Sequence, residues 1–185
     1  MSSPLAHHSP SVTRGSVFEA LFVRALQPGG RFAEELRAAG YDVGSPPRAE
    51  YPTQVWRACV EVARRHTFPR LPQAEGERRL GGLFLEGFLQ TLAGKLLSAT
   101  LPMLGTGMVL QKLQRAWSSS QPNLEVSTAQ VAERHWRVTL REEGVLVEHC
   151  AGLLEGILRR TRVQPEVKVL ERSATHCVLD VRWSP

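Results

Sequence analysis

The sequence predicts an α+β fold in which a helical N-terminal half packs on a four-stranded antiparallel sheet. In the first half, apolar residues recur every three or four positions, whereas after the polar run at residues 118–123 apolar and polar residues alternate. The chain has 185 residues, of which 42% are hydrophobic and 22% are charged, so it can build one ordinary core. We therefore expect a single domain over residues 14–185, preceded by a disordered leader over residues 1–13.

The first elements are short. Residues 17–26 are rich in branched and aromatic side chains and end at a Pro-Gly-Gly break, which predicts a buried strand or a docking segment. Residues 31–39 have helical spacing, and Gly40 is placed to end that helix. Residues 41–52 hold three prolines and predict an irregular connection anchored by Tyr51.

Longer helices follow. Thr53 is a candidate N-cap for a helix that runs to about Phe68, before two prolines. A second helix begins at Gln73, and its apolar residues recur at three and four as far as Ala99. Pro102 should break or kink this helix before a helical pattern resumes over residues 108–117. The uncharged stretch at residues 96–111 is too short and too interrupted for a membrane span.

The second half predicts strand, strand, helix, strand, strand. Alternation predicts strands over residues 124–132, 134–141, 166–171 and 175–183. Residues 146–161 carry an apolar stripe at helical spacing. Neighbouring hairpin strands pair antiparallel, so this half should form one sheet with the helix across one face.

Charge and cysteine content exclude several classes of protein. The net charge is +5, but the arginine pairs lie far apart, so we expect no nucleic-acid partner. The three cysteines, an odd number, form no disulfide framework. We expect reduced thiols and a cytoplasmic location.

The helix that begins at Gln73 holds the candidate ligand site. Glu86 and Gln90 lie one turn apart in an apolar stretch of this helix, beside Gly81, Gly82, Gly87 and Gly94. The glycines allow close helix packing with Glu86 facing solvent, or they leave room for an apolar ligand. In the second case the expected ligand-binding residues are Trp56, Phe84, Glu86, Phe88, Gln90, Leu92 and Trp117.

Two His-Cys dipeptides offer an alternative chemistry. His149, Cys150, His176 and Cys177 have the side chains that zinc prefers, and a thiol nucleophile can be proposed for the same residues. Geometry opposes a shared ion, because adjacent strand residues point to opposite faces and Cys150 lies on an apolar helix stripe. The simpler interpretation is a pair of buried cysteines beside two surface histidines, with no metal site and no catalytic residue.

Four segments carry a resemblance to a known family. They are VFEALFVRAL at residues 17–26, YPTQVWRACVEVARR at 51–65, RRLGGLFLEGFLQTLAGKLL at 78–97 and CAGLLEGILRR at 150–160. In this order they resemble an uncharacterised paralogous family of roughly 200-residue proteins described from myxobacteria, a domain of unknown function. The family's polar Asn-rich stretch is represented here only by SSSQPN.

The order of elements is more distantly similar to 4-vinyl-reductase-like, TRAPP-like and haem nitric-oxide-binding domains. Several of these hold apolar ligands or act as sensor and assembly modules, which is what the resemblance implies here. The haem-binding branch carries a Tyr-x-Ser-x-Arg motif that this sequence lacks, so we expect no cofactor.

These observations favour a non-enzymatic domain that binds an apolar small molecule or a partner protein, as a sensor or interaction module. The apolar stretch at residues 96–110 favours a homodimer contact. The alternative is a thiol- or metal-dependent enzyme centred on the His-Cys pairs.

Overall fold

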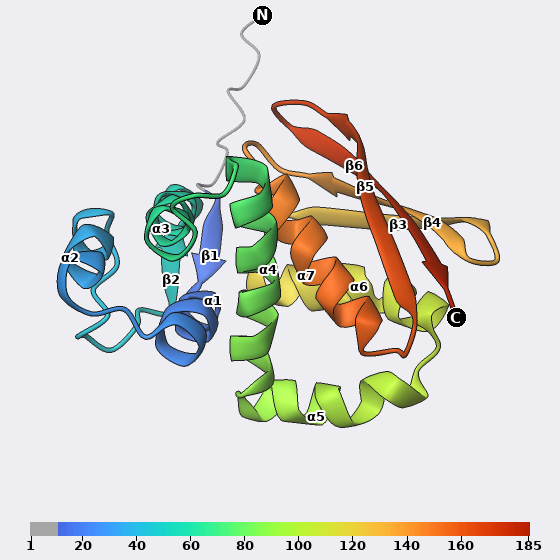
Figure 1. Cartoon of the computed structure of the whole chain (residues 1–185), viewed down its shortest axis with the longest axis horizontal. Coiled ribbons are helices and arrows are strands. Elements are labelled where there is room, and N and C mark those ends of the chain that lie inside the picture. The colour runs from blue at the N-terminus through green and yellow to red at the C-terminus, as the bar shows by residue number, and fades with distance from the viewer. Residues whose placement is uncertain (1–10) are drawn as a thin grey trace, which may run out of the picture.

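A computed structural model describes residues 11–185 and has the predicted α+β architecture (Figure 1). The helices are α1 (Gly15–Phe18), a π-helix (Glu19–Leu26), α2 (Gly30–Ala38), α3 (Thr53–Thr67), α4 (Gln73–Leu89), α5 (Leu92–Thr100), a 3-10 turn (Leu101–Met103), α6 (Thr106–Ser120) and α7 (Val147–Arg159). The strands are β1 (Val12–Arg14), β2 (Glu50–Pro52), β3 (Glu125–Ala132), β4 (His135–Arg141), β5 (Gln164–Arg172) and β6 (His176–Ser184). Residues 1–10 of the predicted leader lie outside the described residues, whereas Val12 and Thr13 lie in β1.

The strand predicted over residues 17–26 is wrong, because α1 and the π-helix occupy this segment. Phe18, Leu21 and Phe22 are fully buried, and their spacing of three and four places them on one helical face. Val17 and Ala20 are buried too, so this helix is enclosed on most sides. A short apolar run in such a helix cannot be distinguished by its sequence from a buried strand. Tyr51 is buried in β2 and so anchors the connection as expected.

The helix predicted to run from Gln73 to Ala99 is two helices. The Thr91 hydroxyl donates a hydrogen bond to the carbonyl of Phe88 and accepts one from the amide of Gly94. Thr91 therefore caps the N-terminus of α5 and separates this helix from α4. Thr53 is the first residue of α3 and makes no side-chain cap, in contrast to the N-cap role predicted for it.

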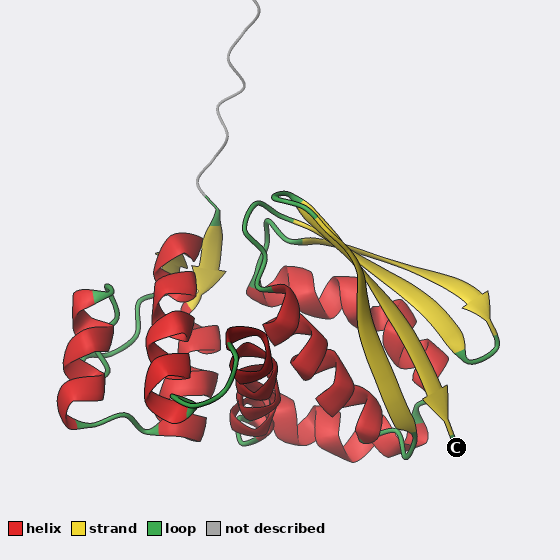
Figure 2. Cartoon of the chain, turned by 45° about the horizontal axis from the view of Figure 1, so that its top comes forward, coloured by secondary structure: helices red, strands yellow, loops and turns green. Residues whose placement is uncertain are grey.

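The second half forms the predicted antiparallel sheet, in the order β3-β4-β6-β5. The register pairs Val138 with Leu179 and Leu140 with Cys177 in the two central strands, and all four side chains are buried. Helix α7 packs against β5, and α6 packs against β3. Figure 2 shows the helices gathered on one side of this sheet.

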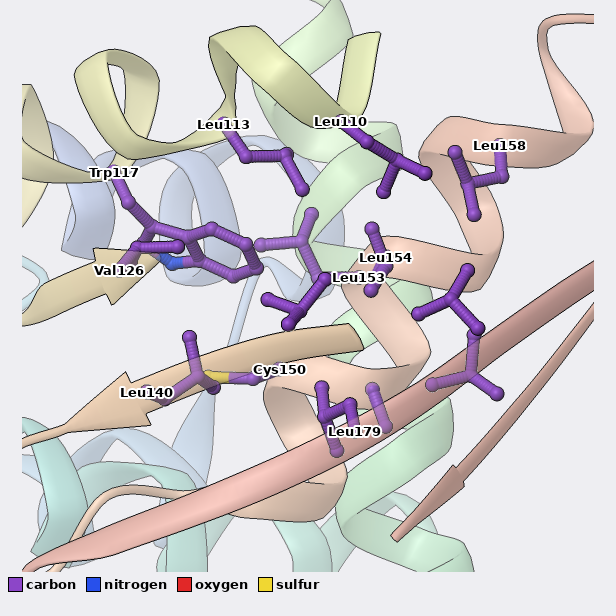
Figure 3. Packing of buried hydrophobic residues seen from close by; sticks show 14 of the residues in the cluster. Leu110, Leu113, Trp117, Val126, Leu140, Cys150, Leu153, Leu154, Leu158 and Leu179 are labelled. Atoms are coloured by element: carbon purple, nitrogen blue, oxygen red, sulfur yellow. The ribbon is translucent and has the colours of Figure 1, made fainter. Parts of the chain in front are cut away.

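The interior consists of two hydrophobic clusters. The sheet cluster joins α6 and α7 to the inner face of the sheet, and Figure 3 shows Trp117, Leu140, Cys150 and Leu154 within it. The N-terminal cluster joins α1, the π-helix, α2 and α3, with Tyr41 and Tyr51. Helix α4 lies between them in Figure 1 and contributes Leu80 to one cluster and Leu85 to the other.

Glycines allow α4 to approach its neighbours at backbone distance. A Cβ added at Gly81 would lie 2.0 Å from the carbonyl oxygen of His149, and one added at Gly152 would lie 1.8 Å from that of Arg78. A Cβ at Gly87 would lie 1.8 Å from the carbonyl oxygen of Ala20 in the π-helix. These contacts support the packing interpretation of the glycines.

Ion pairs reinforce the crossing of α4 and α7. The Arg78 guanidinium lies 2.8 Å from carboxylate oxygens of both Glu148 and Glu155, and it donates to the carbonyl of Val167 in β5. Both carboxylates are largely buried, with side chains 14% and 15% exposed. This network therefore ties α4, α7 and β5 together by charge-assisted hydrogen bonds.

Within residues 11–185, every helix falls short of the length and apolar character that a membrane crossing requires.

Candidate functional site

A cavity of about 690 Å³ lies between the two clusters. Side chains from α1, the π-helix and α3 line one side, and α4, α5, α6, α7 and the loop at residues 142–146 complete it. Its apolar lining consists of Val17, Trp56, Phe84, Leu85, Phe88, Leu92, Ala93, Leu97, Leu113, Ala116, Trp117, Val145, Leu146, Cys150, Leu153 and Ile157. A volume of this size is typical of small-molecule sites.

The structure brings six of the seven predicted ligand-site residues to this cavity. They are Trp56, Phe84, Phe88, Gln90, Leu92 and Trp117. Glu86 lies outside the lining, because its side chain is 57% exposed and pairs with Arg160 at 2.8 Å. Both interpretations of α4 thus hold in part: Gly81 and Gly87 pack closely against neighbouring helices, whereas Phe84 and Phe88 line the cavity.

Aromatic rings form one wall. The rings of Trp56 and Phe84 meet edge to face with centroids 6.3 Å apart, and those of Phe84 and Phe88 are stacked at 6.5 Å. These rings come from α3 and α4. The close contact of Gly81 with the α7 backbone, which positions α4, therefore also positions the rings of Phe84 and Phe88. Rings in edge-on and stacked arrangements are well suited to contact an apolar or aromatic ligand.

Among residues 11–185, His149 contributes the one imidazole of the lining. Its residue is 4% exposed, and its ring meets Trp56 edge-on at 5.6 Å and Phe84 at 5.8 Å. Nδ1 is buried with no hydrogen-bond partner among the described residues. Burial lowers the pKa of this imidazole from 6.5 to about 4, so the ring is neutral at pH 7.

The cationic groups of the lining are already engaged. The Arg24 guanidinium donates to the Glu19 carboxylate at 2.8 Å, and Arg57 donates to the carbonyl of Glu143. The lining is therefore mostly apolar, with a neutral imidazole, the Arg24–Glu19 ion pair and the Arg57 guanidinium, which bonds a neutral carbonyl.

The two His-Cys pairs do not converge. Cys150 and Cys177 are buried in the sheet cluster, whereas the His176 side chain is 42% exposed and its Nδ1 lies 2.7 Å from the Ser173 hydroxyl. Over the described range, no group of three or more His, Cys, Asp or Glu side chains is arranged to hold a metal ion. Burial raises the pKa of the Cys177 thiol to about 11 and raises that of Cys150 further still.

The expectation of two surface histidines is wrong for His149. Its position carries a signal that could have revealed this, because Leu146, His149 and Leu153 are spaced three and four apart and share one helical face. The loop at residues 142–146 carries no such signal, since only the tertiary fold brings it against α6 and α3.

A family model for proteins of unknown function, DUF2378, matches residues 11–184. The chain belongs to this family. The predicted resemblance to an uncharacterised family is therefore confirmed. A search of curated proteins found no match.

Solved structures share the fold. An oxygen-binding H-NOX domain related to soluble guanylate cyclases has a TM-score of 0.71 at 11% identity, covering 93% of this chain and 95% of that one. An H-NOX protein from S. oneidensis in the Fe(II)NO state gives 0.71 at 12%, covering 93% and 99%. An H-NOX mutant of T. tengcongensis gives 0.62 at 15%, covering 93% and 98%. The fainter similarity predicted to haem nitric-oxide-binding domains is thus confirmed at the level of fold.

The H-NOX fold raises the question of a haem, and the residues of this cavity do not fit one. A histidine that binds a metal almost always donates its other ring N–H to a carboxylate, carbonyl or water, which orients the ring. His149 is the one imidazole in the lining, and its buried Nδ1 has no such partner among residues 11–185. The two lining arginines are also engaged with Glu19 and the Glu143 carbonyl.

Proposed function

We propose that this chain is a non-enzymatic sensor domain that binds an apolar small molecule in the cavity between its two hydrophobic clusters. The cavity itself carries the proposal: about 690 Å³ of space lined mainly by aromatic and aliphatic side chains. The predicted binding residues Trp56, Phe84, Phe88, Gln90, Leu92 and Trp117 supply its walls.

Two further observations support this function. Domains of the same fold were solved with oxygen and in the Fe(II)NO state, so the fold accommodates a ligand in those proteins.

The three cysteines are free thiols buried in the interior, and burial raises the pKa of Cys59 to about 12. A thiol nucleophile requires a lowered pKa, so the thiol-enzyme alternative has less support. Free thiols also favour the expected cytoplasmic location.

The uncharged fluorescent probe N-phenyl-1-naphthylamine tests the proposal. We expect one probe per chain to bind with enhanced emission. Because Ala116 and Ile157 line the cavity, a double variant with Ala116→Trp and Ile157→Trp should weaken binding at least roughly tenfold by occupying the space.

The matched control replaces two exposed residues on the same helices, Arg115→Trp and Arg159→Trp, and should bind the probe as the wild type does. Equal binding by all three proteins would contradict the proposal. A stoichiometric haem absorption band in protein purified from haem-supplemented cells would also contradict it.

The homodimer expectation belongs to this proposal and rests on exposed apolar side chains around α5. Leu92, Leu96 and Met103 are 79%, 66% and 86% exposed. Covering such a patch is favourable in water.

Light scattering of the wild-type protein should give twice the chain mass of 20.6 kDa, and the double variant Leu96→Glu with Met103→Glu should give the mass of one chain. Leu170→Glu, at a 50% exposed site in β5, is the control; a monomeric wild type would refute the dimer.

A further inference from the structure

Helix α5 and the 3-10 turn after it expose apolar side chains along one edge of the molecule (Figure 1). Leu92 and Leu96 lie one turn apart on α5, Met103 lies in the 3-10 turn, and all three are largely exposed. Within Leu92–Thr100, Gly94 is the one buried residue. We call Leu92, Leu96 and Met103 the α5 patch. Exposed apolar side chains that gather in this way mark a contact with a protein or a membrane.

The segment that carries the α5 patch has positive charges without negative ones. Residues 87–124 contain no aspartate or glutamate, and their charged residues are Lys95, Lys112 and Arg115. All three of these side chains belong to exposed residues. The acid that precedes the segment, Glu86, is paired with Arg160 at 2.8 Å. Apolar side chains beside cations are typical of helices that lie on the surface of an anionic bilayer.

The α5 patch also adjoins the cavity. Leu92 belongs to both, and Ala93 and Leu97 of the same helix line the cavity as well. An apolar molecule that leaves a bilayer at this patch therefore reaches the cavity with little exposure to water, where its apolar surface is unfavourable.

We propose that the α5 patch docks this domain on the surface of an anionic lipid bilayer. Leu92, Leu96 and Met103 insert among the acyl chains, and Lys95 lies at the level of the headgroups. The protein lies on the membrane and does not cross it. The docking does not depend on the cavity, so it goes beyond the proposed function.

A second copy of the chain would cover the same patch in the proposed homodimer. A two-fold contact places a surface against itself, so it brings the Lys95 side chains of both copies toward one contact, and residues 87–124 supply no acid to neutralise them. An anionic headgroup layer does neutralise these charges. The bilayer therefore competes with the second copy for the α5 patch.

Co-sedimentation of the full chain with lipid vesicles tests the inference. The anionic vesicles are phosphatidylcholine with about one third phosphatidylglycerol, and the neutral vesicles are phosphatidylcholine alone. We expect the wild type to bind the anionic vesicles at least roughly tenfold more tightly than the neutral ones, and less tightly as salt is added.

Two variants separate the apolar contribution from the charged one. Leu96→Glu with Met103→Glu should weaken binding to the anionic vesicles at least roughly tenfold, because insertion is lost. Lys95→Glu leaves the apolar side chains in place and should weaken binding roughly tenfold through charge alone.

The matched controls make the same changes on the sheet. Leu170→Glu and Lys168→Glu replace exposed residues of β5 and should bind the anionic vesicles as the wild type does. All the replaced residues are exposed, so circular dichroism melts should match those of the wild type.

The vesicle measurement uses no cavity ligand, so its failure leaves the proposed function standing. Equal binding to the two kinds of vesicle, or unchanged binding by either α5 variant, would overturn the inference. A wild type that stays in the supernatant as a dimer would also overturn it and would assign the α5 patch to the second copy alone.

Discussion

Gly81→Ala is expected to destabilise the protein by about 3 kcal/mol, since its Cβ has no space. That atom would lie 2.0 Å from the carbonyl oxygen of His149 and 2.7 Å from the amide nitrogen of Leu153. Both obstacles are backbone atoms of α7, so neither can rotate away, and α4 must separate from α7. Urea unfolding at pH 7 measures the loss.

Gly82→Ala is the matched control, one residue further along α4. A Cβ at this position meets nothing within 4 Å. We expect the variant to be more stable than the wild type by about 1 kcal/mol, because alanine has the higher helix propensity. Similar changes in the free energy of unfolding for Gly81→Ala and Gly82→Ala would show that the backbones of α4 and α7 are not in contact at Gly81.

Acid should remove about 3 kcal/mol of stability through His149 alone. Burial holds the pKa of this imidazole at about 4 in the folded protein, whereas its ordinary value is 6.5. Between these values the unfolded chain binds the proton and the folded protein does not. The stability contribution is therefore complete above pH 6.5 and is lost as the pH falls toward 4.

His149→Phe isolates this effect. The free energy of unfolding of the wild type should fall relative to the variant by about 2 kcal/mol between pH 6.5 and pH 5. This window lies above the region where the carboxyls with lowered pKa values, among them Glu35, Glu61 and Asp180, take up protons. The other histidines are shared by the two proteins and cancel in the difference. Parallel pH profiles would show that the imidazole is not desolvated.

The sheet was predictable because its strands have one buried and one exposed face. Alternating side chains such as Trp136, Val138 and Leu140 mark a pleated surface directly in the sequence. Residues 17–26 carry no comparable contrast, since Phe18, Leu21 and Phe22 belong to a helix enclosed on most sides. Periodicity identifies an element best where it is half-exposed.

The site was predicted in part for a similar reason. Phe84 and Phe88 could be assigned to one face of α4 from spacing alone, and they line the cavity. Glu86 lies between them in the sequence but on the opposite side of the helix, where it meets Arg160. His149 was missed because a polar residue beside an apolar stripe normally faces water, although its spacing from Leu146 and Leu153 places it on a lining face of α7.

The division of the interior into two clusters has a consequence for how occupancy could be sensed. The cavity is lined by residues of both clusters, so a molecule that fills it contacts both, and its binding free energy stabilises their association by thermodynamic linkage. Without a ligand, the contact between the two clusters would open before the rest of the domain unfolds. With a ligand bound, the whole domain would unfold in one cooperative transition at a higher temperature.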